Sequence, residues 1–99
     1  MAKTLIVGSD HAGLDLKREL SGVAAELGYE VVDLGTHSSD STDYPDYAHQ
    51  VARAVANGDG LGLLVCGTGI GMSMTANRHS GVRAALCGDV FSASMTRQH

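Results

Sequence analysis

The sequence predicts an α/β protein, a Rossmann-like three-layer sandwich in which helices cover both faces of a parallel sheet. Short apolar runs of strand length recur along the chain, and segments with apolar residues at helical spacing separate them. Glycines follow most of these runs, and 13 glycines against one proline suit tight turns inside a regular fold. Because strands that alternate with helices join by right-handed crossovers, we expect one parallel sheet with four strands in this chain.

The predicted elements alternate along the whole chain. In order they are a strand over 4–7, a helix over 14–27, a strand over 29–34, a helix from Tyr44 to Asn57, a strand over 61–66, a helix over 72–77, a strand over 82–87 and a helix that Asp89 opens. Gly28 ends the first helix, as glycine commonly does. The run over 61–66 is apolar throughout, which is typical of a central strand covered on both faces. Asp89 is a suitable N-cap for the last helix.

Length and composition indicate one globular domain over residues 1–99. Hydrophobic residues make up 43% of the chain and charged residues 18%, which is not the composition of a disordered segment. The net charge of −4 and the lack of basic runs argue against nucleic acid as a partner. No stretch approaches the ~20 apolar residues that span a bilayer, so no membrane partner is expected either.

The cysteines and the N-terminus favour a cytoplasmic protein. Cys66 and Cys87 do not make a disulfide framework, so both thiols are expected to be reduced. The first residues lead straight into a strand pattern and lack the long apolar region of a signal peptide. At the other end, residues 96–99 stop inside an unfinished helical pattern, which slightly favours a domain that is incomplete at its C-terminus.

Two segments are candidates for a ligand site, because ligands of such sheets bind beyond the carboxyl ends of the strands. The first segment is Ser9 to His11, after the first predicted strand. Asp10 can accept hydrogen bonds from ligand hydroxyls, and His11 can contact a phosphate. On spacing alone, capping of the next helix is the role that we favour for Asp10.

The second segment, Cys66 to Gly71, is the most informative one. Its three glycines at alternate positions allow backbone N–H groups to turn toward one point, and the helix that follows adds unpaired donors. Such a loop can hold a phosphate or an oxyanion formed during a reaction, and it favours a thiolate at its lip. The alternative is a structural turn beside an inert, buried cysteine. The spacing G-x-G-x-G differs from the dinucleotide motif, and the Lys-Ser/Thr pair of a P-loop is absent.

The second cysteine and three of the histidines have no catalytic role in this interpretation. Cys87 ends the fourth predicted strand without a glycine loop, so we expect it to pack in the protein. We expect His37, His49 and His79 to face solvent, since they fall in a polar loop, on a helix and in a turn. None of them has metal-ligand spacing to a cysteine or a carboxylate, so no metal site is predicted.

Six segments match one known family. They are Gly8 to Gly13, Asp33 to Thr36, Thr42 to Pro45, Cys66 to Gly71, Ala76 to Arg78 and Thr96 to His99. Together they resemble ribose-5-phosphate isomerase B and the wider family that includes the galactose-6-phosphate isomerase subunits, and the resemblance extends over the entire chain. It implies a cofactor-independent enzyme of the pentose phosphate pathway that interconverts ribose 5-phosphate and ribulose 5-phosphate. It further implies a homodimer or homotetramer whose active sites are shared across a subunit interface.

The resemblance also implies roles for individual residues. Cys66 resembles the base that moves a proton between C1 and C2, and Thr68 and His99 resemble groups that assist opening of the furanose ring. The remaining implied contacts are Gly67, Thr68, Gly69, Ile70 and Gly71 as an anion hole for the enediolate, Asp10 and His11 as sugar and phosphate contacts, and Tyr44 as a residue that lines the pocket.

Two alternatives to the pentose phosphate enzyme stay open. The first is an isomerase of a hexose 6-phosphate, of the allose or galactose type, within the same family. The second is a non-catalytic module that binds phosphate sugars, because a fold does not dictate a function. Members of the family continue past the position of His99 with a fifth strand, a C-terminal helix and arginines that clamp the phosphate. The resemblance therefore agrees with a C-terminally incomplete domain.

Overall fold

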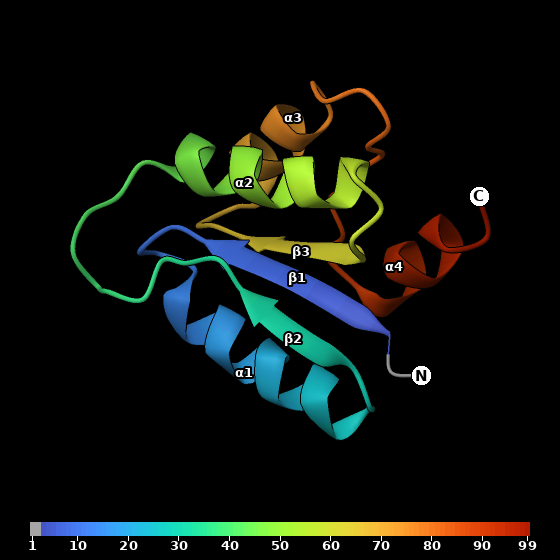
Figure 1. Cartoon of the computed structure of the whole chain (residues 1–99), viewed down its shortest axis with the longest axis horizontal. Helices are drawn as coiled ribbons and strands as arrows, with labels where there is room; N and C mark the ends of the chain where they lie inside the picture. Colours follow the sequence, from blue (N-terminus) through green and yellow to red (C-terminus); the bar gives the residue numbers. More distant parts are fainter. Residues whose placement is uncertain (1–2) are drawn as a thin grey trace.

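A parallel sheet with the strand order β2-β1-β3 forms the centre of the molecule (Figure 1). The structure is a computed structural model and describes residues 3–99. Its strands are β1 (Thr4–Ser9), β2 (Glu30–Asp33) and β3 (Leu61–Val65). Both pairings are parallel, and Ile6 in β1 lies opposite Val32 on one side and Gly62 on the other. The first three predicted strands and their parallel arrangement are confirmed.

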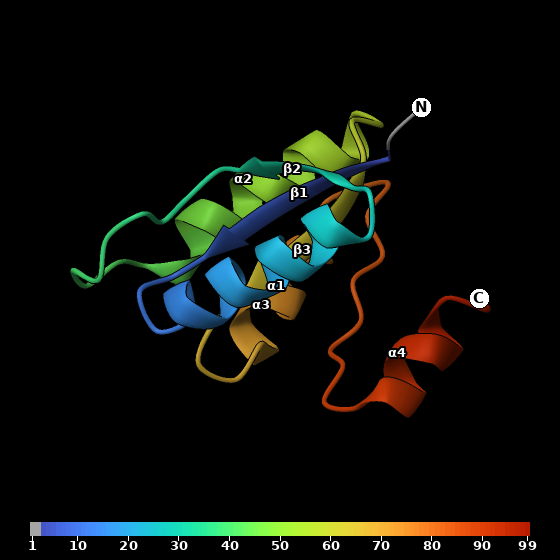
Figure 2. The same ribbon diagram turned by 90° about the horizontal axis from the view of Figure 1, so that it is seen from below.

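Helices cover both faces of this sheet, so the predicted three-layer α/β class is confirmed. Helix α1 (Leu14–Glu26) packs on one face, and α2 (Tyr44–Ala56) and α3 (Ile70–Ala76) pack on the other (Figure 1). Helix α4 (Val90–Thr96) lies apart from these three, toward the amino ends of β1 and β3 (Figures 1 and 2). Within residues 3–99, no helix combines the length and apolar character needed to cross a membrane.

The core lies between β1 and the α2–α3 layer. Ile6, Val51 and Met72 are almost completely buried there. Gly8 allows this close approach, because a Cβ on it would lie 2.8 Å from a methyl group of Val51. Gly13 has the same function at the start of α1, where a Cβ would lie 2.5 Å from the carbonyl oxygen of Val65. The two glycines therefore set how closely the helices approach β1 and β3.

A buried lysine joins α1 to the end of β2. The side chain of Lys17 is fully buried, and its Nζ donates to Oδ1 of Asp33 at 2.7 Å and to the carbonyl oxygen of Thr36. The same Asp33 oxygen accepts a hydrogen bond from the Gly35 N–H at 2.9 Å. A buried ammonium group requires such partners, because leaving it unpaired in the interior is costly. The predictions from sequence gave Lys17 no role.

The fourth predicted strand, Val82 to Cys87, is wrong. Within residues 3–99 this segment pairs with no strand, and the outer edge of β3 has no backbone partner. The backbone of Ala84 is instead bound by the amide side chain of Asn77, which accepts from its N–H and donates to its carbonyl oxygen, both at 2.8 Å. These contacts tie the segment to the end of α3. The expectation that β3 is a central strand fails as well: helices contact both of its faces, but it is an edge strand in the order β2-β1-β3, and Leu61 at its start is 39% exposed.

The predicted N-cap of α4 is confirmed. Asp89 accepts hydrogen bonds from the backbone N–H and from the hydroxyl group of Ser92, each at 2.7 Å. These two bonds, the backbone one first, lower the pKa of the Asp89 carboxyl group below its usual value. The apolar residues that follow it are not buried, since Val90 and Phe91 are 86% and 73% exposed.

Candidate active site

The carboxyl ends of β1 and β3 bring Asp10 and Cys66 side by side. Ser9 is the register partner of Val65, and the Asp10 N–H donates to the Val65 carbonyl oxygen at 3.3 Å. Asp10 and Cys66 are the next residues on their strands. The loop after β1 then stays beside the loop after β3, because a Cβ on Gly67 would lie 4.0 Å from that of Ala12. The two segments selected from the sequence therefore share one site.

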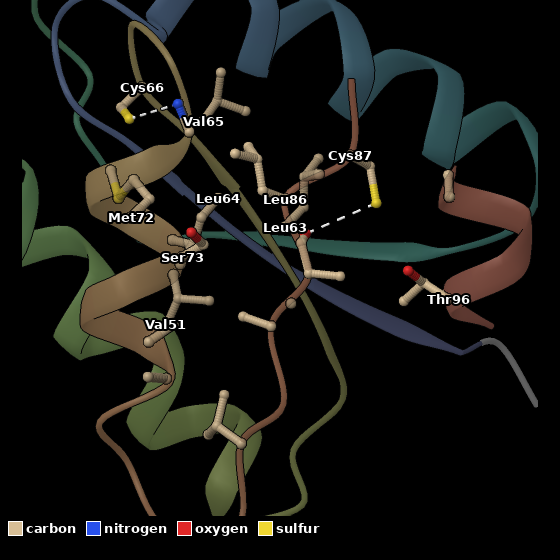
Figure 3. A pocket seen from close by; sticks show the side chains of 18 of the residues that line it. Val51, Leu63, Leu64, Val65, Cys66, Met72, Ser73, Leu86, Cys87 and Thr96 are labelled. Carbon is tan, nitrogen blue, oxygen red and sulfur yellow. Dashed lines mark hydrogen bonds between the residues drawn. The ribbon is translucent and has the colours of Figure 1, made fainter. Parts of the chain in front are cut away.

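The loop after β3 folds back onto the sulfur of Cys66. The Gly69 N–H donates to Cys66 Sγ at 3.0 Å (Figure 3). The Ile70 N–H donates to Thr68 Oγ1 at 3.2 Å. Gly69 has a φ of +79°, a conformation that favours glycine, and it is the N-cap of α3. Cys66 is half-buried. A donor on the sulfur lone pairs is compatible with both the thiol and the thiolate.

Some N–H groups of this loop remain open to a ligand. Within residues 3–99, those of Gly67, Thr68 and Gly71 donate to no protein acceptor. Those of Gly69 and Ile70 are already occupied by side chains of the loop itself. The anion hole expected over Gly67 to Gly71 therefore has fewer free donors than the glycine pattern indicates.

Asp10 lies below the loop as a buried carboxylate. It is 8% exposed, and its Oδ1 accepts from the Gly13 N–H at 3.0 Å. This bond closes the turn that leads into α1, whose N-cap residue is Gly13. The role that spacing favoured for Asp10, the cap of α1, is wrong: no side chain caps this helix, and Asp10 stabilises the preceding turn instead.

His11 is held by the long loop between β2 and α2. Its N–H donates to Thr42 Oγ1 at 2.9 Å, and the Thr42 N–H donates to the ring nitrogen Nδ1 at 3.1 Å. The imidazole itself is exposed. The loop over residues 36–43, drawn in green at the left of Figure 1, thus returns to the end of β1. Thr42 begins one of the six matched segments, but nothing in the sequence pointed to its contact with His11, because 31 residues separate the two.

Tyr44 reaches the same site from the first residue of α2. A Cβ on Gly71 would lie 2.6 Å from the Tyr44 ring, so the glycine makes room for the tyrosine. Tyr44 is 39% exposed. The expected position of Tyr44 beside the glycine loop agrees with this packing.

His99 lies elsewhere in this chain. It is the last residue, and the end of the chain marked C lies toward the amino ends of the strands in both views (Figures 1 and 2). Its carbonyl oxygen accepts from Arg83 at 3.4 Å. The structure therefore brings Asp10, His11, Tyr44 and the Cys66 loop together, and it does not bring His99 to them.

A cavity of about 650 Å³ lies beside Cys66, lined among others by residues of β3, α3, the segment over 82–87 and α4 (Figure 3). Aliphatic side chains such as Leu63, Leu64 and Leu86 form much of its wall. Cys87 lies there too, but its side chain is exposed, so the packing role expected for it is wrong. The wall suits apolar groups, and the polar groups of the site lie at the rim formed by Cys66 and the glycine loop.

His49 and His79, which were predicted to face solvent, contact each other. His49 Nδ1 and His79 Nε2 are 2.8 Å apart, and both side chains are half-buried. That prediction is wrong for this pair and is confirmed for His37, which is exposed. Residues separated by 30 positions meet because α2 and α3 pack together. In the part of the chain that the structure describes, no three His, Cys, Asp or Glu side chains are arranged to hold a metal ion.

The fold and the site together define an α/β protein with a ligand site at the carboxyl edge of its sheet, where a thiol stands at the head of a glycine loop. A family model described as Ribose/Galactose Isomerase matches residues 5–99. The chain belongs to this family.

Similar proteins support the assignment. The chain is 52% identical over 99 residues to ribose-5-phosphate isomerase B of Escherichia coli, a match that covers 98% of this chain and 66% of that protein. Among solved structures, ribose-5-phosphate isomerase B of Clostridium thermocellum superposes with a TM-score of 0.94 at 46% identity, over 97% of this chain and 66% of that one. The type B ribose 5-phosphate isomerase of Trypanosoma brucei superposes with a TM-score of 0.95 at 46% identity, over 100% of this chain and 68% of that one. The chain thus spans about two thirds of the length of these relatives.

Proposed function

We propose that this chain carries the catalytic half-site of an aldose–ketose isomerase that interconverts ribose 5-phosphate and ribulose 5-phosphate. The observation that carries the proposal is the position of Cys66, whose sulfur accepts the Gly69 N–H at 3.0 Å beside the buried carboxylate of Asp10. Similarity to ribose-5-phosphate isomerases B supports the choice of substrate.

The reaction requires a base next to a carbonyl group and donors for the oxygen that becomes charged. In the open-chain aldose, the Cys66 thiolate takes the proton from C2, and the electron pair moves through C1 to O1 to give an enediolate. The free N–H groups of Gly67, Thr68 and Gly71 stabilise that oxygen. The proton returns to C1 while another moves from O2 to O1, so C2 becomes the ketone. Substrate and product are isomers, so the balance requires no oxidant or reductant.

The other site residues bind and open the sugar in this proposal. Asp10 accepts from sugar hydroxyls, His11 donates to an oxygen of the sugar phosphate, and Tyr44 closes the pocket over Gly71. Thr68 assists opening of the furanose ring. His99 does so from a second copy of the chain, since its own terminus lies away from Cys66. The active form is therefore an oligomer in the cytoplasm, a dimer or a tetramer.

Replacement of Cys66 by serine tests the assignment of the base. We expect Cys66→Ser to lower kcat for ribose 5-phosphate by about a hundredfold or more, because the proton acceptor is lost. Affinity for the substrate should change much less. The matched control is Cys87→Ser, which removes the exposed thiol and should leave turnover unchanged. A Cys66→Ser protein with turnover close to that of the parent would contradict the proposal.

The same assay separates the sugar classes. Ribose 5-phosphate, allose 6-phosphate and galactose 6-phosphate are offered in parallel to the parent chain. Preference for a hexose 6-phosphate would replace the pentose assignment and keep the role of Cys66. Binding of all three without turnover would make the chain a binding module.

A further inference from the structure

The contact between His11 and Thr42 fixes which imidazole nitrogen carries hydrogen. The Thr42 N–H can only donate, so the ring nitrogen that it meets at 3.1 Å, Nδ1, must offer a lone pair. A neutral imidazole carries its single hydrogen on the other nitrogen, Nε2. His11 is exposed, and within residues 3–99 its Nε2 contacts no acceptor. The structure thus presents an N–H donor from His11 at the edge of the site.

The Thr42 hydroxyl group holds this arrangement in place. Its Oγ1 accepts the backbone N–H of His11 at 2.9 Å and lies 3.4 Å from Nδ1. The two residues exchange hydrogen bonds in both directions, and this reciprocal pair fastens the loop over 36–43 to the end of β1. The Thr42 N–H meets Nδ1 only while the loop is fastened. The hydroxyl group is the part of the contact that a substitution can remove without touching the backbone donor.

We propose that Thr42 is a positioning residue for His11 that keeps its imidazole in the Nε2–H tautomer, so that Nε2 donates to an oxygen of the bound sugar phosphate. The inference rests on the proposed function and deepens it by naming how the loop over 36–43 takes part in binding. The acceptor is a phosphate oxygen or a sugar hydroxyl oxygen, since either accepts from a neutral N–H.

Three variants test the proposal in the full chain. Thr42→Val keeps the branched shape and removes the hydroxyl group, and Thr42→Ser restores a hydroxyl group at the same position. Ser41→Ala is the matched control, because Ser41 is the exposed neighbour in the same loop and lies outside the site. Nitrogen-15 NMR of the imidazoles reports the tautomer of His11 directly. Steady-state kinetics with ribose 5-phosphate and titrations with ribose 5-phosphate, inorganic phosphate and ribose report binding.

The expected result has a spectroscopic and a kinetic component. The parent, Ser41→Ala and Thr42→Ser should show an unprotonated Nδ1 and a protonated Nε2. Thr42→Val should show a mixture of tautomers, and its KM should rise roughly three- to tenfold with kcat within about twofold of the parent. Weaker binding of inorganic phosphate in this variant identifies the phosphate as the acceptor. If the variant binds ribose more weakly but inorganic phosphate as tightly as the parent does, the acceptor is a sugar hydroxyl oxygen.

Two results would overturn the proposal. One is a parent spectrum in which His11 carries its hydrogen on Nδ1, which needs no variant to observe. The other is a Thr42→Val protein whose tautomer and ligand affinities equal those of the parent. Failure of the proposed function is distinguishable from both. A parent that binds ribose 5-phosphate without isomerising it contradicts the isomerase, while the tautomer and the affinities still decide the role of Thr42.

Discussion

Gly69 shapes the loop that holds the sulfur of Cys66. Its φ of +79° is one that residues with a Cβ adopt at a cost, and a Cβ there would lie 2.6 Å from a methyl group of Leu86. The N–H that binds the sulfur belongs to this same residue. The geometry around the Cys66 thiol, the proposed base, therefore depends on one position that only glycine fills without strain.

We expect Gly69→Ala to lower turnover of ribose 5-phosphate. The strain of about 1 kcal/mol and the clash with Leu86 shift the N–H away from Cys66 Sγ. Gly58→Ala is the matched control, because Gly58 has a similar φ of +85° at the end of α2 and a Cβ there meets no atom within 4 Å. Thermal unfolding should show both variants destabilised, and the isomerase assay should show a loss in Gly69→Ala alone. Equal activity of the two variants would contradict the role given to the loop.

The residues found from the sequence differ from those missed in one physical respect. Asp10, His11 and Cys66 each follow a strand directly, so the rule on strand ends located them. Thr42 and Lys17 have their side-chain partners 31 and 16 residues away, and nothing beside them in the sequence indicates these contacts. Such residues become visible only when the fold brings their partners to them.

Among the elements, the helices and the first three strands were predictable, and the segment Val82 to Cys87 was not. Its apolar residues suit a strand, but a strand also needs a neighbour for its backbone hydrogen bonds. Asn77 supplies those bonds to Ala84 from a side chain instead, and sequence periodicity does not report such a competitor. Periodicity also does not report that α2 contacts the turn after α3 through His49 and His79.

We expect the His49–His79 contact to stabilise the packing of α2 on α3 at neutral pH. The hydrogen bond requires one ring nitrogen to donate and the other to accept, so it cannot form when both rings carry two hydrogens. A double-mutant cycle with His49→Ala and His79→Ala should give a coupling of about 1 kcal/mol in urea unfolding at pH 8.

His37→Ala is the control for this cycle, because His37 is exposed and should have no coupling with His79. A coupling of zero between His49 and His79 at pH 8 would contradict the hydrogen bond as a source of stability.

At the scale of the whole molecule, apolar side chains are well buried in one part of the chain and exposed in another. The sheet and α2 bury their facing residues, whereas Leu86, Val90 and Phe91 are at least half exposed near the 650 Å³ cavity. The similarity of fold to solved ribose-5-phosphate isomerases B extends nevertheless over nearly the entire chain. The well-packed part of the molecule is the part that positions Asp10, His11 and Cys66.

The uncovered outer edge of β3 has a consequence for amide hydrogen exchange. Even-numbered residues of β1 face β3, as the bond from the Asp10 N–H to Val65 shows, so the N–H groups of Leu63 and Val65 point inward to β1. Those of Gly62 and Leu64 point to the open edge. We expect exchange rates along β3 to alternate, slow at Leu63 and Val65 and fast at Gly62 and Leu64, in a dilute sample. If copies of the chain pair through this edge, the two fast amides should become protected as the protein concentration rises. Uniform protection along β3 in the most dilute sample would show that the edge is already covered within one chain.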